Sequence, residues 1–391
     1  MPGPGTGKSR TLCACSLVAE LLRADTILIS RGPGETRYAL MAGDMLVDVA
    51  HMRDGAVLPG AVYFARIGAP VPHMPAVFVN LGDAGTGVLK IKPPRPSEGA
   101  GIAVTVVVPA RGPKSVEVKL EADVPVPADG RTGALLRAAP DPAAAWWAEH
   151  AATVTQIVCD SRAEAQRLKA LLGAAAPVEI HPPGADLFDV RGVDEAIEAA
   201  LDPTVPLPCG GSLVIETTTA VITIDVNTGP ADIDTANNEA LIAVARELRR
   251  RNLAGHILVD VIPTRRGGTL PPLLAELTAG DPAVRVAGRT PLGMIELSRR
   301  RVGLSLAEVL CGPDGRLSAA SVGYKLLRDA VRYGFTEKAA RIAVEVSPEV
   351  ADLLAGILAP ARAEAEAALK GEIQVTARAD LPRARFVVRA A

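Results

Sequence analysis

The chain has 391 residues, and its 42 Lys and Arg against 44 Asp and Glu give a formal net charge of −2. Because domains usually hold roughly 100–200 residues, this length predicts two or three domains. Hydrophobic residues make up 49% of the sequence, which excludes a wholly disordered chain. The balanced charge excludes a uniformly basic nucleic-acid-binding surface but leaves a local basic groove open.

Other compositional features narrow the class of protein. Aromatic residues are 3% of the chain, so extended base-stacking platforms are not expected. No run approaches the roughly 18 apolar residues of a membrane span, so we expect no membrane partner. The cysteines are odd in number and form no CxxC pair, which is typical of a cytoplasmic chain with reduced thiols. They are Cys13, Cys15, Cys159, Cys209 and Cys311.

The run from Gly3 to Ser9 is similar to the end of a phosphate-binding loop. The full pattern needs a glycine at the position of Pro2 and a strand before it. We therefore expect no nucleotide cofactor. A nucleotide hydrolase that uses Lys8 is the least favoured of the three functions considered in this subsection. Residues 1–25 are predicted to form a helical extension.

Short β-strands dominate from Thr26 onward. A β-meander is predicted at 27–29, 36–40 and 46–49. Residues 57–92 contain short strands separated by Gly and Pro, which predicts a small antiparallel barrel. Further strands are expected at 102–108 and 116–120, before a Pro-rich linker.

An α/β pattern follows over residues 141–201. Helices at 143–152 and 161–172 flank the strand Gln156–Cys159, and a short helix is expected at 193–201. The Pro-rich stretch Pro203–Pro208 predicts a domain boundary.

Two strand-borne acids follow this boundary. The strand 220–226 places Thr223, Asp225 and Asn227 on one face, and a carboxylate in an otherwise apolar strand is costly to bury unless it is compensated. A helix over 236–251 leads to a strand over 257–262 that contains Asp260. Such a crossover commonly lays its two strands side by side in one sheet.

Two carboxylates on neighbouring strands can bind a divalent metal, and Mg²⁺ suits them because it takes one or two carboxylates and accepts phosphate oxygens. Asn227 could then orient an acid or a bound water. The spacing alone leaves a structural role open, because strand acids also pair with Arg or cap backbone groups. Arginines cluster at 249–251, 265–266 and 299–301, which would suit a phosphodiester substrate, although solvated helix ends explain some of them.

Several motifs resemble the catalytic region of the ribonuclease E/G family. Their order and spacing match from residue 210 to residue 299, and the segments are Gly210–Glu216, Ile224–Gly229, Asn238–Ala240, Ala245–Gly255, Ile257–Ile262 and Leu292–Arg299. Four earlier segments are similar more weakly: Arg31–Arg37, Ala76–Gly82, Gln156–Ser161 and Leu187–Asp189. The resemblance runs from about Thr26 to the C-terminus.

The resemblance implies a multidomain α/β fold. An RNase H-like domain (26–50 and 141–205) would be interrupted by an OB-fold RNA-binding barrel (51–99) and a reduced 5′-sensor region (100–140). A DNase I-like α/β catalytic domain (206–315) and a small C-terminal α/β domain (316–391) would follow. Residues 1–25 lie outside the resemblance.

The resemblance also implies an activity: Mg²⁺-dependent endonucleolytic cleavage of single-stranded RNA, in rRNA or mRNA processing or decay, to 5′-phosphate and 3′-hydroxyl ends. Asp225 and Asp260 would bind the metal, and Asn227 would be their hydrogen-bonding partner. The RNA-binding residues would be Phe78, Arg137, Arg249, Arg251, Arg299 and Arg301. A homodimer stays open.

Three departures from the family pattern bear on these expectations. The zinc-binding Cys-Pro-x-Cys-x-Gly motif is replaced by Cys311–Gly315, so we expect no zinc. Ala138 follows Arg137 where the family's phosphate-binding Arg has a Thr partner, and Val88 replaces an RNA-stacking aromatic. The alternative function is therefore a catalytically weakened RNA-binding relative of the same fold.

Overall fold

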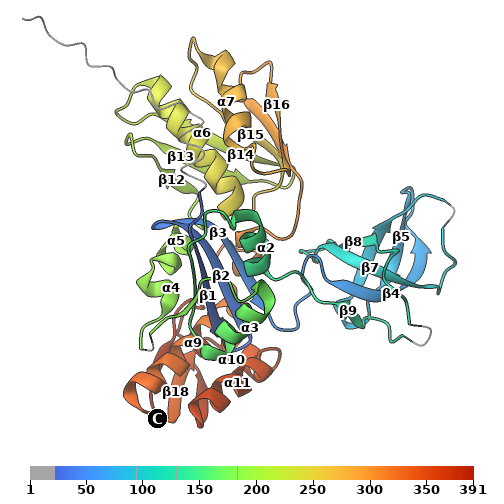
Figure 1. The fold of residues 1–391 in the computed structure, drawn as a ribbon, viewed down its shortest axis with the longest axis vertical. Coiled ribbons are helices and arrows are strands. Elements are labelled where there is room, and N and C mark those ends of the chain that lie inside the picture. The colour runs from blue at the N-terminus through green and yellow to red at the C-terminus, as the bar shows by residue number, and fades with distance from the viewer. Residues whose placement is uncertain (1–22, 94, 128–129, 183) are drawn as a thin grey trace, which may run out of the picture. The chain divides into compact units, whose positions relative to one another are not determined.

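A computed structural model describes residues 23–93, 95–127, 130–182 and 184–391 (Figure 1). The Gly3–Ser9 run lies outside these ranges, and so do all but the last three residues of the helical extension predicted over 1–25. The described chain forms two compact units. The first unit contains Asp202–Arg249 and Gly255–Arg300, and the second contains Asp25–Leu201, Arg250–Ala254 and Arg301–Ala391.

The first unit is built on a six-stranded sheet in the order β12-β13-β14-β15-β17-β16. Only the central pair β14 and β15 is parallel among these neighbours. The strands are β12 Thr204–Pro206, β13 Ser212–Thr217, β14 Val221–Asn227, β15 Gly255–Asp260, β16 Val284–Arg289 and β17 Ile295–Arg299. The predicted β–α–β crossover is confirmed, because the parallel pair requires a connection that returns to the same end of the sheet.

Helix α6 (Ile233–Arg250) makes this crossover, and α7 (Leu270–Leu277) follows β15 after a short 3₁₀ turn, η2 (Gly267–Thr269). Alternate strand residues such as Ile224 and Val226 are buried, and α6 has a buried apolar stripe that includes Leu241 and Val244. The sheet therefore has one covered apolar face, and the intervening strand residues lie on an open face.

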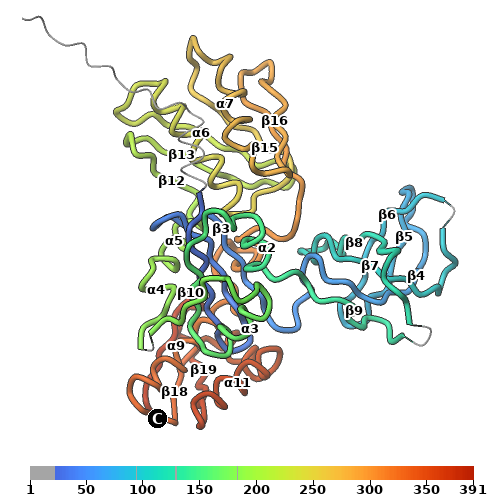
Figure 2. The backbone as a smooth tube through the Cα atoms, in the orientation of Figure 1, coloured from blue at the N-terminus to red at the C-terminus, as the bar shows by residue number. Residues whose placement is uncertain are grey.

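The second unit contains a five-stranded mixed sheet in the order β11-β10-β1-β2-β3. Its strands are β1 Thr26–Gly32, β2 Glu35–Ala42, β3 Met45–Arg53, β10 Gln156–Cys159 and β11 Val178–Ile180. Figure 2 shows that β1 and β10, far apart in the sequence, lie side by side, and they pair in parallel. The associated helices are α2 Pro142–His150, α3 Arg162–Leu172, α4 Leu187–Val190 and α5 Val193–Ala199.

A closed barrel is inserted between β3 and α2. Five strands run in the order β5-β6-β8-β7-β4, a β4–β5 pairing closes them, and β9 pairs with β4 outside this ring. The strands are β4 Val62–Pro70, β5 Ala76–Asn80, β6 Thr86–Lys90, β7 Gly101–Val108, β8 Val116–Leu120 and β9 Leu135–Arg137, and η1 is Gly82–Ala84. The barrel has its own core of buried Val, Leu and Ile side chains.

The barrel differs from its sequence prediction in two respects. Its β6 and β8 pair in parallel, so it is not fully antiparallel. It also takes β7 and β8 from residues 100–140, the region predicted as a reduced sensor. These strands close the core that 62–90 cannot close alone, whereas the sensor assignment itself stays a prediction.

The C-terminal part of the second unit is an α/β layer with a three-stranded sheet in the order β19-β18-β20. Its elements are α8 Leu306–Leu310, α9 Ala319–Glu337, β18 Arg341–Val346, α10 Pro348–Ala355, α11 Ala359–Leu369, β19 Glu372–Ala377 and β20 Val387–Ala390. Residues from α9, α10, α11 and the three strands form one apolar core, whereas Leu306 and Leu310 of α8 pack in the core of the five-stranded sheet. Among the described helices, none is both long and apolar enough to cross a membrane.

Buried Glu35 joins this C-terminal layer to the five-stranded sheet. Its carboxylate accepts hydrogen bonds from Arg53 Nε at 2.9 Å and from Arg328 Nη1 at 2.6 Å, and His51 Nδ1 lies 3.3 Å away. Burial would raise the pKa of Glu35, but its bond with His51 and the charges of Arg328 and Arg53 hold that pKa well below its usual range. The carboxylate therefore stays ionised and fixes β2, β3 and α9 together.

Candidate active site

The parallel pairing of β14 and β15 brings two acids together. In this register Asp225 lies opposite Asp260, and both are the exposed, final paired residues of the ladder. Neighbouring strands lie about 4.8 Å apart, and residues paired in register point to the same side of a sheet. The two carboxylates therefore stand next to each other on the open face, at the carboxyl ends of their strands.

Asn227 lies on the same face, two residues after Asp225. Its Nδ2 donates a hydrogen bond to Asp225 Oδ2 at 3.1 Å. The side chain thus restrains one carboxylate and leaves its other oxygen available. The structure brings together all three residues that the sequence predicts as a catalytic group.

Solvent exposure changes the energetic argument made from the sequence. Asp225 and Asp260 are exposed, so their charges require no buried partner to offset desolvation. Within the described ranges, neither carboxylate forms an ion pair with Lys, Arg or His. The structural alternative, in which arginines neutralise these acids, therefore has no support in the geometry.

Two glycines allow the loops around Asn227 to pack in direct contact. A Cβ on Gly211 would overlap the carbonyl oxygen of Asn227, and one on Gly229 would overlap that of Gly210. Gly229 also has φ of 58°, a conformation that favours glycine. Any larger side chain at Gly211 would push the Asn227 backbone away from its position.

Two of the predicted RNA-binding arginines are buried. Arg251 and Arg299 are each 7% exposed, and Arg299 Nε donates to Asp281 Oδ2 at 2.7 Å. Arg301 is half-buried and pairs with Glu308 at 2.8 Å, and Arg249 is also half-buried. These positions do not support direct RNA contact by Arg251 or Arg299, whose burial the sequence pattern did not reveal.

Other arginines of the first unit are better exposed. Arg265 and Arg266 follow Asp260 on the loop that leaves β15, and the side chain of Arg266 is 77% exposed. Arg285 on β16 is exposed and pairs in register with Ser298, which places it on the open face of the sheet. Strand alternation around Arg285 is the signal that identifies it, once the order of the strands is known.

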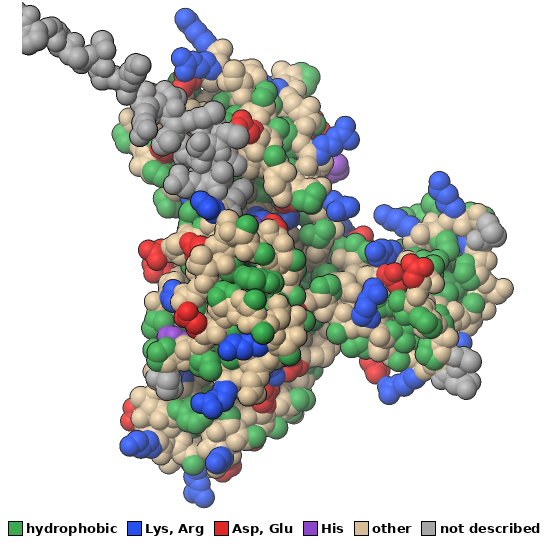
Figure 3. All heavy atoms as spheres, viewed as in Figure 1, with side chains coloured by type: hydrophobic (Ala, Val, Ile, Leu, Met, Phe, Trp, Pro, Cys, Tyr) green, Lys and Arg blue, Asp and Glu red, His purple; other side chains and the backbone are tan. Residues whose placement is uncertain are grey.

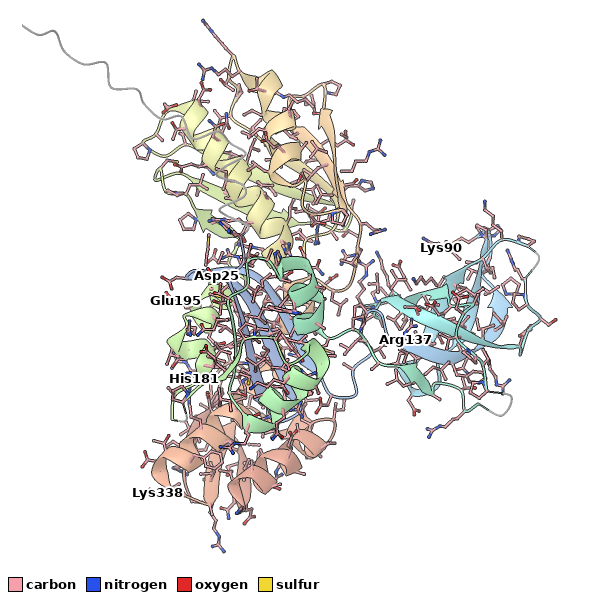
Figure 4. The ribbon with its side chains drawn as sticks, in the orientation of Figure 1. Asp25, Lys90, Arg137, His181, Glu195 and Lys338 are labelled. Carbon is pink, nitrogen blue, oxygen red and sulfur yellow. The ribbon has the colours of Figure 1, made fainter. Side chains whose placement is uncertain are left out.

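Phe78 and Arg137 both lie in the barrel sheet. Phe78 on β5 is half-buried and lies opposite Val88 on β6, the position where the sequence lacks a second aromatic. Arg137 on β9 is exposed (Figure 4). Its guanidinium pairs with Glu121 at 3.5 Å. A hydrogen bond from Thr105 to Glu121 lowers the pKa of that carboxyl, so an ionised acid faces the guanidinium.

On the face shown in Figure 3, Lys and Arg side chains are interspersed with acidic and hydrophobic ones. This distribution agrees with the balanced composition.

The second unit has a groove of about 540 Å³ whose lining includes Asp186, Arg332 and Thr336. These residues belong to the second unit and not to the sheet that carries the paired acids.

The residues present fit a magnesium ion. Mg²⁺ commonly takes one or two carboxylates and completes its coordination with waters and phosphate oxygens. Asp225 and Asp260 supply such a pair on a surface that is open to solvent. Within the described ranges, no group of three or more His, Cys, Asp and Glu side chains could hold a metal. Cys311, the cysteine at the position of the family's zinc-binding motif, is half-buried, and burial raises the pKa of its thiol.

Residues 130–302 match the model of the Ribonuclease E/G family. Ribonuclease G of Haemophilus influenzae is 36% identical over 187 residues, which are 43% of this chain and 38% of that protein. Ribonuclease G of Escherichia coli is 33% identical over 208 residues, or 48% of this chain and 42% of that protein. This chain is therefore similar to the ribonuclease E/G family over residues 130–302.

The similarity extends beyond the ribonuclease G proteins. Ribonuclease E of a Nostoc species is 34% identical over 180 residues, 41% of this chain and 26% of that protein. The chain thus spans less than half the length of these relatives. The ribonuclease E/G match contains β14, α6 and β15, and therefore both acids, whereas barrel strands β4 to β8 lie before it.

Proposed function

We propose that this protein is a Mg²⁺-dependent endoribonuclease that cleaves single-stranded RNA, in RNA processing or decay, and leaves 5′-phosphate and 3′-hydroxyl ends. The observation that carries the proposal is the register of Asp225 with Asp260 on an open sheet face. Similarity to the ribonuclease E/G family supports the same activity, because the matched relatives are named ribonuclease G and ribonuclease E.

Each residue of the group has a distinct task in this proposal. Asp225 and Asp260 would hold the ion, which when bound would offset negative charge and promote attack by water on the phosphodiester. Asn227 would keep the Asp225 carboxylate in one orientation through its hydrogen bond. Exposed Arg265 and Arg285 would contact phosphates and hold the RNA strand over the open face.

The domain assignment forms part of the proposal. The five-stranded sheet and its helices would be the RNase H-like domain, and the closed barrel the OB fold that grips RNA. The first unit would be the DNase I-like catalytic domain, followed by the small C-terminal domain. A cytoplasmic location is also part of the proposal.

A weakened RNA-binding relative is the alternative function. The observations that favour it are the Arg137–Glu121 pair, which offsets the charge of the predicted phosphate-binding cation, and the aliphatic Val88 opposite Phe78. Both features lower the expected affinity for RNA. The acid pair favours catalysis instead.

Cleavage of an end-labelled, single-stranded RNA oligonucleotide tests the proposal. We expect cutting in Mg²⁺, none in EDTA, and a large loss of rate in Asp225→Asn and Asp260→Asn proteins. Glu276→Gln, which changes an exposed acid on α7 of the same unit, is the matched control and should cut normally. Wild-type rates in either aspartate variant would refute the assignment, whereas RNA binding without cleavage by the wild-type protein would favour the alternative.

A further inference from the structure

Asn237, in the second turn of α6, is fully buried at 0% exposure. Both polar atoms of its side chain pair with the backbone of Ile262: Nδ2 donates to the Ile262 carbonyl oxygen at 2.8 Å, and Oδ1 accepts from the Ile262 amide at 3.0 Å. The side-chain amide thus makes the two hydrogen bonds that a neighbouring strand would otherwise make.

The bridge from Asn237 is important because Ile262 lies beyond the end of the β14–β15 ladder. β15 ends at Asp260, and its last paired residue across β14 is Asp260 itself. Two residues later the chain has left the ladder, so the backbone groups of Ile262 need partners from elsewhere. Asn237 supplies both partners and fixes the direction in which the chain leaves β15.

Other α6 side chains hold the neighbouring loops. Asp234 Oδ1 accepts from Thr264 Oγ1 at 2.7 Å, in the loop that leaves β15. Glu239 Oε2 accepts from the Cys209 amide at 2.7 Å, in the loop that precedes β13. The start of α6 therefore restrains the loop that leaves β15 and the loop that precedes β13, the neighbour of β14.

We infer that Asn237 is a positioning residue for the proposed cation site. Its bridge to Ile262 holds the end of β15 so that the Asp260 carboxylate stays beside Asp225. The inference rests on the proposed function, because it concerns the same pair of acids. Asparagine suits the task because one planar group presents a donor and an acceptor without charge.

A purely structural role would have a different signature. Loss of a buried hydrogen-bonded amide lowers stability wherever it lies, because the backbone groups that it leaves are unsatisfied. A positioning role also changes the cation affinity of the folded protein. Partners that orient metal ligands typically contribute about 10–100-fold to metal affinity or activity.

Binding of Mn²⁺, followed by electron paramagnetic resonance on the full-length protein, separates these roles without relying on cleavage. We expect Asn237→Leu to weaken Mn²⁺ binding by about tenfold. The same variant should lower kcat in RNA cleavage while leaving KM for RNA unchanged. Asn237→Ser is uncharged and can make at most one of the two hydrogen bonds in place of the amide, so we expect a loss of the same kind and smaller size.

Thr278→Val is the matched control. Thr278 is 7% exposed, lies just beyond α7 in the same unit, and donates to the Leu274 carbonyl oxygen at 2.8 Å. Its loss should lower the stability of the first unit without changing Mn²⁺ affinity. Measurements at a temperature where each variant is folded by circular dichroism remove the contribution of stability.

The outcomes distinguish this inference from the function on which it rests. Normal Mn²⁺ affinity in folded Asn237→Leu, or equal weakening in Thr278→Val, would overturn the inference alone. If Asn237→Leu does not fold, Asn237→Ser decides by the same criterion. A wild-type protein that binds no Mn²⁺, or an Asp260→Asn variant that binds it normally, would overturn the proposed function as well.

Discussion

Replacing Glu35 with Gln should unfold the second unit at a much lower denaturant concentration. Glu35 is 2% exposed, and its carboxylate contacts Arg53, Arg328 and His51. The variant leaves two guanidinium groups facing a neutral amide. Because removing one partner of a buried ion pair typically costs about 3–5 kcal/mol, we expect a loss of that size in the free energy of unfolding.

Tryptophan fluorescence during urea titration measures this loss. The chain has two tryptophans, Trp146 and Trp147, and both lie on α2 in the second unit. Glu364→Gln is the control, because Glu364 is an exposed acid that pairs with Arg31 and should cost less than about 1 kcal/mol. An unchanged unfolding midpoint in Glu35→Gln would refute the reasoning.

The pH dependence of the same transition provides a second check. The folded-state pKa of Glu35 lies below its usual unfolded value of about 4.3, so its contribution to stability is present above that value. It is lost as the pH falls through the lower folded-state pKa. The difference in stability between wild type and Glu35→Gln should therefore be largest near neutral pH and shrink in acid; a constant difference would contradict this account.

Three further predictions concern RNA. Gly211→Ala should abolish most cleavage, because its Cβ would displace the Asn227 backbone; normal cleavage by the folded variant would show that this contact is dispensable. Asn227→Ala should slow cleavage by about 10–100-fold at unchanged RNA affinity, since it removes the bond to Asp225, and single-turnover kinetics would expose a wrong assignment as an unchanged rate. Val88→Phe, opposite Phe78, should strengthen binding of a short RNA by about 1–3 kcal/mol in fluorescence anisotropy, and a gain of similar size in a Phe78→Ala background would show that the two rings do not act together.

The sequence predicted the fold best where local pattern and connection rules agree. Alternation placed Asp225 and Asn227 on one face, and the crossover rule placed Asp260 on the neighbouring strand; the register confirms both. Exposure could not be predicted in the same way, because alternation separates two faces but does not show which face another layer covers. Asp225 is in fact exposed, so its charge does not need the compensating partner that a buried position would require.

The arginines show a different limit. A run such as 249–251 or 299–301 looks uniformly basic in the sequence, yet the fold buries some members and exposes others. Arg299 pairs with Asp281 on a separate loop, a contact that no short-range pattern encodes. The prediction of the barrel failed for the same reason, because closure depends on pairing of β7 with β4 and of β8 with β6, and other strands separate the members of each pair in the sequence.

The acids of the proposed site are 35 positions apart in the chain and become neighbours only when the crossover through α6 closes. An extended chain cannot offer them to one ion, so occupancy and folding of the first unit would be linked equilibria. Any divalent ion that binds there would stabilise this unit by an amount that grows with the logarithm of its free concentration. The persistence of the first unit in a cell would then depend on the available magnesium, while the second unit would gain nothing directly from it.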